Sequence, residues 1–208
     1  MVTLVVYNTP GPAREVRVLT VLVVRLVAEK RYQDAAPMGA ACADLPLVWH
    51  FVGQLQTNKV RSVVGYADVV QSVDRARLVS ALSKEAVRAG REVGCLVQVA
   101  FDAGADGRGE RGGVAPSGVA ELADLVAGAE GLRLDGLMTV APLTGEYAGR
   151  QQAAFERLMD LSTDLRRTHP AANMVSAGMS ADLEQAVAAG ATHVRVGSAV
   201  LGVRPRLG

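Results

Sequence analysis

Short runs of apolar residues alternate along the chain with longer segments whose apolar residues recur at the spacing of a helix. The short runs are rich in Val and Leu, as in strands buried on both faces of a parallel sheet. The predicted strands are Thr3–Tyr7, Val23–Ala28, Trp49–Val52, Val69–Ser72, Cys95–Phe101, Gly136–Val140, Met174–Ser176 and His193–Val196. The predicted helices are Ala13–Leu22, Tyr32–Cys42, Asn58–Val64, Arg75–Ala89, Ser117–Ala127, Arg150–Arg167 and Ala181–Ala189.

This alternation predicts the fold class. Strands that are each followed by a helical stretch predict an α/β protein with a parallel sheet, and eight strands is the number that closes a (β/α)8 TIM barrel. An open doubly wound sheet is the alternative, but no GxGxxG motif follows the first strand. The segment Asp102–Gly113 is rich in Gly and charge, which predicts a mobile loop after the fifth strand. No composition shift marks a second domain, so residues 1–208 are predicted to form one domain.

Local signals mark some helix ends. Asp74 and Ser180 each directly precede a predicted helix, and their side-chain oxygens are suited to accept otherwise unpaired N–H groups as N-caps. Gly90 and Gly190 stand where the C-terminus of a helix requires a left-handed residue.

Composition narrows the class of protein further. A chain of 208 residues that is 50% hydrophobic, with a formal net charge of +1, is typical of a globular domain and offers no basic patch for nucleic acid. Cys42 and Cys95 form no CxxC pair, which favours a reducing compartment and argues against structural zinc. The apolar run Val16–Ala28 is interrupted by Arg17 and Arg25 and is too short to span roughly 30 Å of hydrocarbon. With no signal peptide pattern, we expect a cytoplasmic monomer that binds neither a membrane nor a metal.

Gly and Ser are concentrated at two predicted junctions between a strand and a helix. Ser176–Ser180 follows the seventh predicted strand, and Gly197 and Ser198 follow the eighth. In a barrel of this type the functional groups lie at the carboxyl ends of the strands, and helix N-termini there present N–H groups to anions. The two junctions therefore predict a phosphate site, with two ordinary capped turns as the alternative.

Three stretches resemble the pyridoxal phosphate (PLP) homeostasis protein family. They are WHFVGQLQTNK at Trp49–Lys59, GLMTVAP at Gly136–Pro142, and the Gly- and Ser-rich stretch Val175–Gly202. The resemblance runs from about Leu4 to the C-terminus, and the first stretch is the most specific. Members of the family are single-domain barrels similar to the N-terminal domain of alanine racemase. The resemblance implies a non-catalytic protein that binds PLP and buffers its supply, with PLP-dependent apoenzymes as partners.

The resemblance also implies which residues hold PLP. Its phosphate would lie against Ser176, Gly178, Met179 and Ser180, with Gly197 and Ser198 opposite. Arg195 would face the ring nitrogen and keep it unprotonated, which weakens the ring as an electron sink; a salt bridge at the end of the barrel is the alternative. Met138 would pack near the ring, or serve as an ordinary core methionine.

The first predicted strand departs from the family pattern. The family has Val-Ser/Thr-Lys-Thr-x-Pro there, and its Lys forms a Schiff base with PLP; this chain has VYNTPGP over residues 6–12. Asn8 or Thr9 takes the place of that Lys, depending on the match, and neither carries an amine. Lys30, at the end of the next strand, is the candidate replacement. The alternative is that Lys30 faces solvent and PLP binds non-covalently. The family helix that precedes the first strand is expected to be truncated here.

The three histidines offer no catalytic arrangement. His50, between Trp and Phe, is expected to be a hydrogen-bonded core residue. His169 is expected at the surface and His193 at the amino end of the last strand, and none has a Ser, Cys or Asp partner in the sequence pattern. The alternatives to a PLP carrier are a racemase-like PLP enzyme and a degenerate barrel that binds phosphate compounds or a protein without PLP.

Overall fold

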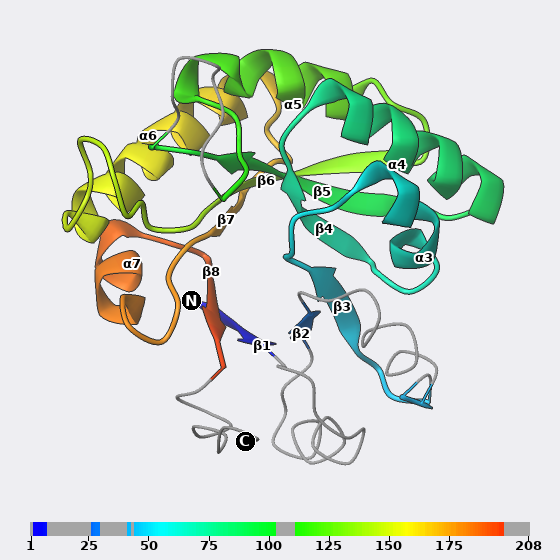
Figure 1. Cartoon of the computed structure of the whole chain (residues 1–208), viewed down its shortest axis with the longest axis horizontal. Helices are drawn as coiled ribbons and strands as arrows, with labels where there is room; N and C mark the ends of the chain where they lie inside the picture. The colour runs from blue at the N-terminus through cyan, green and yellow to red at the C-terminus, as the bar shows by residue number, and fades with distance from the viewer. Residues whose placement is uncertain (1, 8–25, 30–40, 43, 103–110, 198–208) are drawn as a thin grey trace.

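Eight parallel strands form a closed barrel, in which each strand pairs with the next and β8 pairs with β1. The computed structural model describes residues 2–7, 26–29, 41–42, 44–102 and 111–197 (Figure 1). The strands are β1 (Thr3–Tyr7), β2 (Leu26–Glu29), β3 (Val48–Phe51), β4 (Val69–Val73), β5 (Val93–Val99), β6 (Leu132–Thr139), β7 (Met174–Ser176) and β8 (His193–Val196). The predicted TIM barrel is confirmed.

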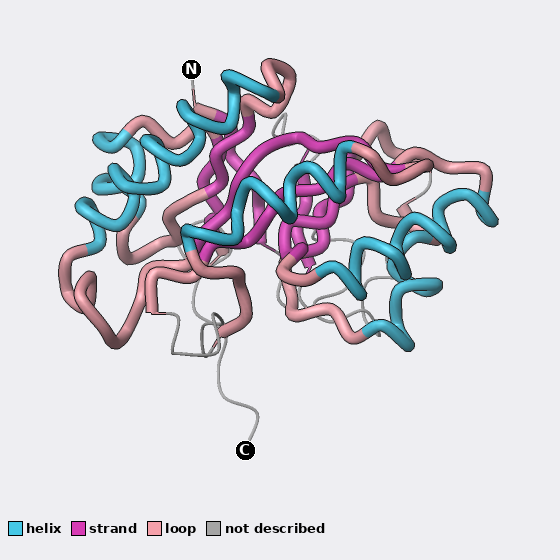
Figure 2. The backbone as a smooth tube through the Cα atoms, turned by 90° about the horizontal axis from the view of Figure 1, so that it is seen from above, coloured by secondary structure: helices cyan, strands magenta, loops and turns pink. Residues whose placement is uncertain are grey.

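Helices surround the strands, as the view from above shows (Figure 2). Among the described residues they are the 3-10 helices η1 (Thr57–Lys59) and η2 (Pro116–Gly118), and the α-helices α3 (Val60–Val64), α4 (Ala76–Ala89), α5 (Val119–Ala127), α6 (Gln151–Thr168) and α7 (Leu183–Ala189). The predicted helix Ala13–Leu22 and most of Tyr32–Cys42 lie outside the described residues. No helix in the described part of the chain is both long and apolar enough to cross a membrane.

The bounds of β2 to β6 differ from the predicted ones, and at β5 and β6 the difference has a clear physical cause. β6 begins at Leu132 rather than Gly136. Its first residues include the charged side chains Arg133 and Asp135, which pair with each other at 2.6 Å, and these charges interrupt the apolar pattern by which the strand was predicted. β5 ends at Val99, two residues before the predicted end. The N–H of Ala100 donates to the carbonyl of Val114 instead of continuing the ladder with β6.

The two predicted N-caps are wrong. The N-cap of α4 is Arg75, and the Asp74 carboxylate accepts from the Arg75 guanidinium rather than from the helix. The N-cap of α7 is Asp182 rather than Ser180. In neither helix does the N-cap side chain form a hydrogen bond with the helix backbone. The helix C-termini behave as predicted.

Gly90 and Gly190 confirm the predicted C-caps. Their φ angles are 62° and 101°, in the left-handed region, and each follows the last residue of its helix. Only glycine adopts that conformation without a clash of Cβ against the backbone.

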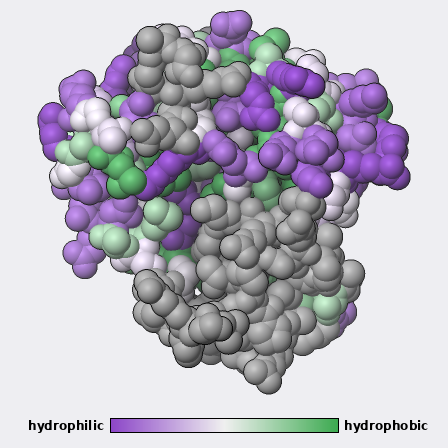
Figure 3. All heavy atoms as spheres, in the orientation of Figure 1, coloured by the Kyte–Doolittle hydropathy of each residue, from purple (hydrophilic) through white to green (hydrophobic). Residues whose placement is uncertain are grey.

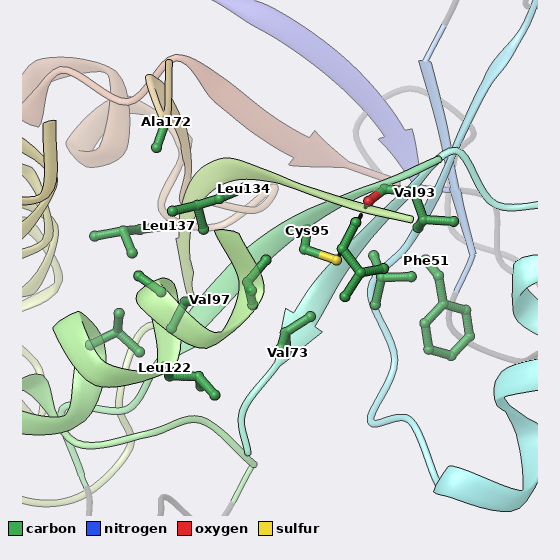
Figure 4. Packing of buried hydrophobic residues seen from close by; sticks show 14 of the residues in the cluster. Phe51, Val73, Val93, Cys95, Val97, Leu122, Leu134, Leu137 and Ala172 are labelled. Carbon is green, nitrogen blue, oxygen red and sulfur yellow. Dashed lines mark hydrogen bonds between the residues drawn. The ribbon is translucent and has the colours of Figure 1, made fainter. Parts of the chain in front are cut away.

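The main core lies between the outer face of the barrel and the helices. It consists of aliphatic side chains with few aromatic ones, as in Figure 4, which includes Val97 of β5, Leu122 of α5 and Leu137 of β6. Phe51 and Phe155 are the aromatic residues of this core. Burial of each Val, Leu or Phe side chain contributes about 1.5–3 kcal/mol, so the many small contacts hold the helices to the barrel. Hydrophilic residues cover much of the described part of the face in Figure 3.

The described end of the predicted loop Asp102–Gly113 is packed rather than loose. Gly112 and Gly113 are buried, and the amide of Gln98 donates to the carbonyls of Arg111 and Gly112 at 3.2 and 3.1 Å. The end of this loop, at Arg111 and Gly112, is therefore held in place at the carboxyl ends of the strands. Residues 103–110 lie outside the described residues.

Candidate functional site

A cavity of about 460 Å³ lies at the carboxyl ends of the strands. It is lined by Val52, Gly53, Gln54, Gln98, Arg111, Val140, Met179 and Arg195. These residues come from β5 and β8, from the segments directly after β3, β6 and β7, and, for Arg111, from the end of the loop that follows β5. The volume lies within the range of about 300–1,000 Å³ that is usual for sites of small ligands, and the lining combines apolar side chains with a few polar ones.

Arg195 places a guanidinium in the wall of this cavity. The residue belongs to β8 and is only 2% exposed. Its Nη1 donates to Ser176 Oγ at 2.7 Å, and its Nη2 donates to the carbonyl of Thr139 at 2.8 Å. A guanidinium stays charged at any physiological pH, so its position in a buried wall favours an anionic or hydrogen-bond-accepting ligand.

Ser176 connects Arg195 to two further buried side chains. Its hydroxyl donates to Gln71 Oε1 at 2.7 Å, and Gln71 Nε2 lies 2.8 Å from His50 Nδ1. Ser176 and Gln71 are each 0% exposed, and His50 is 1% exposed. The predicted role of His50 as a hydrogen-bonded core residue is confirmed.

Burial keeps His50 neutral. Loss of solvent, together with a smaller effect of the nearby His193, lowers the pKa of its imidazole from 6.5 to about 3. His50 Nε2 has no hydrogen-bond partner among the residues that the structure describes. A neutral imidazole with one nitrogen accepting from Gln71 must carry its proton on the other nitrogen.

The junction between β7 and α7 forms a tight turn beside the cavity. Gly178 has φ 83°, and a Cβ at this position would lie 2.4 Å from the Cβ of Ala186. Its carbonyl accepts from the backbone N–H of Arg195 at 2.9 Å, which ties the turn to β8. The N–H of Met179 donates to Asp182 Oδ1 at 2.6 Å, and the Met179 side chain lines the cavity. Ser180 follows with an exposed side chain.

The other predicted cofactor-binding residues are distributed as follows. Met138 is 0% exposed and packs inside the barrel with Val69 and Leu96; Val52 packs against this cluster and also lines the cavity, so Met138 lies in the position of a core methionine. Gly197 is half-buried at the end of β8. The predicted residues outside the described part of the chain are Asn8, Thr9, Lys30 and Ser198.

Two histidines lie away from the cavity. His193 is the first residue of β8, and its Nδ1 lies 2.8 Å from Thr192 Oγ1; burial lowers the pKa of its imidazole. His169 is the C-cap of α6, and its Nε2 lies 2.7 Å from Asp124 Oδ1. Neither contacts the cavity lining. Among the described residues, no group of His, Cys, Asp and Glu side chains is arranged to hold a metal ion.

Gln71 and Gln98 are the functional candidates that the sequence interpretation missed. Each interrupts an otherwise apolar strand, in VVQSV and CLVQV, and each is buried. A lone amide within an apolar strand is costly unless it is hydrogen-bonded, so this interruption was the signal for a polar barrel interior.

Sequence comparisons place the chain among known proteins. The family described as alanine racemase, N-terminal domain, matches residues 12–205. The pyridoxal phosphate homeostasis protein of Pseudomonas aeruginosa is 37% identical over 204 residues, which cover 98% of this chain and 85% of that protein. The protein of the same name from Mycobacterium tuberculosis strain H37Rv is 40% identical over 212 residues, with 93% and 79% covered.

Solved structures agree with the sequence comparisons. The structure of PipY from Synechococcus elongatus PCC7942 with PLP bound has a TM-score of 0.83 at 31% identity, covering 97% of this chain and 92% of PipY. An alanine racemase from Clostridium difficile 630 has a TM-score of 0.73 at 16% identity, covering 99% of this chain and 53% of the racemase, and so shares the fold alone. With its closed barrel, its cavity at the carboxyl ends of the strands and these relatives over nearly its whole length, the chain belongs to the pyridoxal phosphate homeostasis protein family.

Proposed function

We propose that this protein binds PLP non-covalently in the cavity at the carboxyl ends of the strands, and that it serves PLP homeostasis without catalysing a reaction. The observation that carries the proposal is the buried guanidinium of Arg195 beside the Gly178 turn. The described residues fit the cofactor, because the cavity combines an apolar wall for a ring with a cation for an acceptor atom. When bound, PLP supplies an aldehyde and an electron-accepting ring.

The phosphate of PLP is assigned to the β7–α7 turn. Gly178, Met179 and Ser180 would hold it, with Gly197 and Ser198 on the facing junction after β8. Glycine at φ 83° has no Cβ to meet Ala186, so α7 packs closely against this turn and its backbone stays beside the cavity. The N-terminus of α7 adds a partial positive charge. The Asp182 carboxylate is 8% exposed and already accepts the Met179 N–H, and this contact shapes the turn.

Arg195 is assigned to the ring. Its Nη1 and Nη2 donate to Ser176 and Thr139, which fixes the plane of the guanidinium in the cavity wall. A permanently charged donor facing the ring nitrogen keeps that nitrogen unprotonated, because two adjacent positive charges repel. An unprotonated ring is a poor electron sink, which suits a carrier that delivers PLP to apoenzymes.

The phosphate assignment is tested by a charge at Ser180. We expect Ser180→Asp to weaken PLP binding at least about tenfold, because like charges about 4 Å apart repel by roughly 4 kcal/mol near a protein surface before screening by salt. PLP binding is followed by its absorbance and by isothermal titration calorimetry. The side chain is exposed, so the substitution leaves the fold intact.

The matched control is Ser180→Asn, which has nearly the same shape as the Asp variant and no charge. Asn should bind PLP within about threefold of the unmodified protein, since an uncharged amide adds no Coulomb repulsion. Equal PLP affinity in the Asp and Asn variants would place the phosphate elsewhere.

A separate experiment tests whether PLP forms a covalent bond with a lysine of the protein. Positions 8 and 9 carry no amine, and the chain has three lysines, Lys30, Lys59 and Lys84. After incubation with PLP and reduction with borohydride, we expect peptide mass analysis to find no pyridoxyl group on any lysine. We also expect no racemisation of alanine beyond that of free PLP, since positions 8 and 9 carry no amine and the sequence pattern shows no paired acid and base. A pyridoxyl adduct on Lys30, or racemisation that depends on the protein, would contradict the proposal.

A further inference from the structure

Four buried polar side chains form one chain through the inside of the barrel. Arg195 of β8, Ser176 of β7, Gln71 of β4 and His50 of β3 are joined by successive contacts of 2.7, 2.7 and 2.8 Å. None of the four is more than 2% exposed. Only one end of the chain, Arg195, lines the cavity. Gln71 and His50 have no assigned role in binding, and Ser176 was expected at the phosphate, although buried polar groups are costly unless they are hydrogen-bonded.

The direction of each hydrogen bond follows from the chemistry of the groups. A guanidinium only donates, so Ser176 Oγ accepts from Arg195. The hydroxyl proton of Ser176 then goes to Gln71 Oε1. This contact leaves the amide nitrogen of Gln71 facing His50, whose Nδ1 must accept. The proton of His50 is therefore on Nε2, and all three bonds run from Arg195 toward His50.

The opposite orientation of the Gln71 amide is disfavoured. In that case Gln71 Nε2 and Arg195 would both donate to Ser176 Oγ, and the hydroxyl proton of Ser176 would lose its acceptor at a site that is 0% exposed. The first orientation leaves only the N–H of His50 Nε2 without a partner among the described residues, whereas the second leaves both His50 Nε2 and the Ser176 hydroxyl proton without one. The lowered pKa of His50 shows that its imidazole is neutral, so one ring nitrogen has a lone pair that can accept from Gln71.

We propose that Gln71 and His50 are positioning residues, which hold Ser176 and through it set the place of the Arg195 guanidinium in the cavity wall. The inference rests on the proposed function, in which Arg195 contacts the PLP ring. It assigns the Ser176 hydroxyl to Arg195 rather than to the phosphate of PLP. The carbonyl of Thr139 is the second anchor, so the guanidinium is held between β7 and β6.

The direction of the bonds is tested without PLP. Nitrogen NMR of the histidine ring distinguishes a proton on Nδ1 from a proton on Nε2. We expect His50 at neutral pH to be uncharged, with its proton on Nε2. A proton on Nδ1 would overturn the proposed orientation, whether or not the protein binds PLP.

The effect on the cavity is tested by two variants of Gln71. Gln71→Leu removes both contacts of the Gln71 amide, and we expect PLP to bind about tenfold more weakly, because Ser176 loses its buried acceptor and no longer holds the Arg195 guanidinium in place. Gln71→Glu keeps the shape and can still accept from Ser176, so PLP affinity should stay within about threefold. The carboxylate cannot donate to His50, so NMR should show a proton on Nδ1 of His50 in that variant.

The control is Ser72→Ala, on the same strand. Ser72 is 2% exposed, and its Oγ has no partner among the described residues. This variant should bind PLP like the unmodified protein and keep the proton of His50 on Nε2. Loss of affinity in all three variants would show that any change in β4 disturbs the cavity, which would overturn a specific role for Gln71.

The remaining outcomes separate the two proposals. If the unmodified protein fails to bind PLP, the proposed function fails, while the NMR measurement still decides the bond directions. If the unmodified protein binds PLP and folded Gln71→Leu binds it equally well, the proposed function stands and the positioning role is overturned. If Gln71→Leu does not fold, Gln71→Glu decides: the positioning role requires near-normal PLP affinity together with a proton on Nδ1 of His50.

Discussion

Replacement of Gly136 by alanine should lower the free energy of unfolding by about 4 kcal/mol or more, the largest effect expected from one added methyl group at the glycines that the structure describes. Gly136 has φ 149° and pairs with Met174 across β6 and β7. A Cβ would lie 1.9 Å from the carbonyl oxygen of Met174 and 2.8 Å from its carbonyl carbon. These are backbone atoms, so relief requires that the two strands separate.

Urea unfolding measured by circular dichroism checks this loss of stability. The control is Gly149→Ala, because Gly149 has φ 72° but no heavy atom lies within 4 Å of its added Cβ. The control should lose only about 1–2 kcal/mol, from left-handed backbone strain alone. If both variants lose the same free energy, the close approach of β6 and β7 does not contribute.

Replacement of Arg195 by leucine should weaken PLP binding about 100-fold. Hydrogen bonds to charged groups contribute about 1.5–3 kcal/mol each, and the variant also removes a cation from the cavity wall. Ser176 Oγ and the Thr139 carbonyl would also lose their donors and would remain as buried acceptors in the cavity wall. Arg195→Lys keeps the charge without the planar fork and should give an intermediate affinity.

The control for Arg195→Leu is Arg157→Leu on the exposed side of α6, where the guanidinium lies 3.8 Å from Asp160. PLP affinity is measured by calorimetry in all three variants, and circular dichroism verifies that each is folded. Unchanged affinity in folded Arg195→Leu would remove Arg195 from the PLP site and leave the phosphate assignment at Ser180 untouched.

Much of the fold could be predicted because a buried strand appears in the sequence as a short run of apolar residues. β1, β7 and β8 have the predicted bounds, since each is a short apolar run next to a turn signal. The prediction was weaker at β6, where Arg133 and Asp135 carry charge at the amino end of the strand. Their ion pair, together with Glu92 at 2.7 Å from Arg133, lets charged residues occupy a strand that the pattern began at Gly136.

Some residues of the candidate site could be predicted from the sequence and others could not. The sequence indicated the carboxyl ends of the seventh and eighth strands, and Met179 and Arg195 do line the cavity there. It did not indicate Gln71, because the contact of Gln71 with Ser176 joins residues 105 positions apart. The sequence also predicted Ser180 as the N-cap of α7, whereas the N-cap residue is Asp182. The geometry of the turn decides this position, since the Asp182 carboxylate accepts from the N–H of Met179.

The sequence by itself determined the number and order of the strands, the barrel, and the face on which a ligand would bind. These properties depend on which residues are apolar and on where Gly interrupts the chain, and both are local. Only the tertiary structure decided which buried polar groups meet. Closure of the barrel brings β3, β4, β7 and β8 around one interior, and there Ser176 donates to Gln71 and accepts from Arg195. A hydrogen bond depends on the distance and direction between two atoms, and no local pattern specifies either for residues so far apart in the chain.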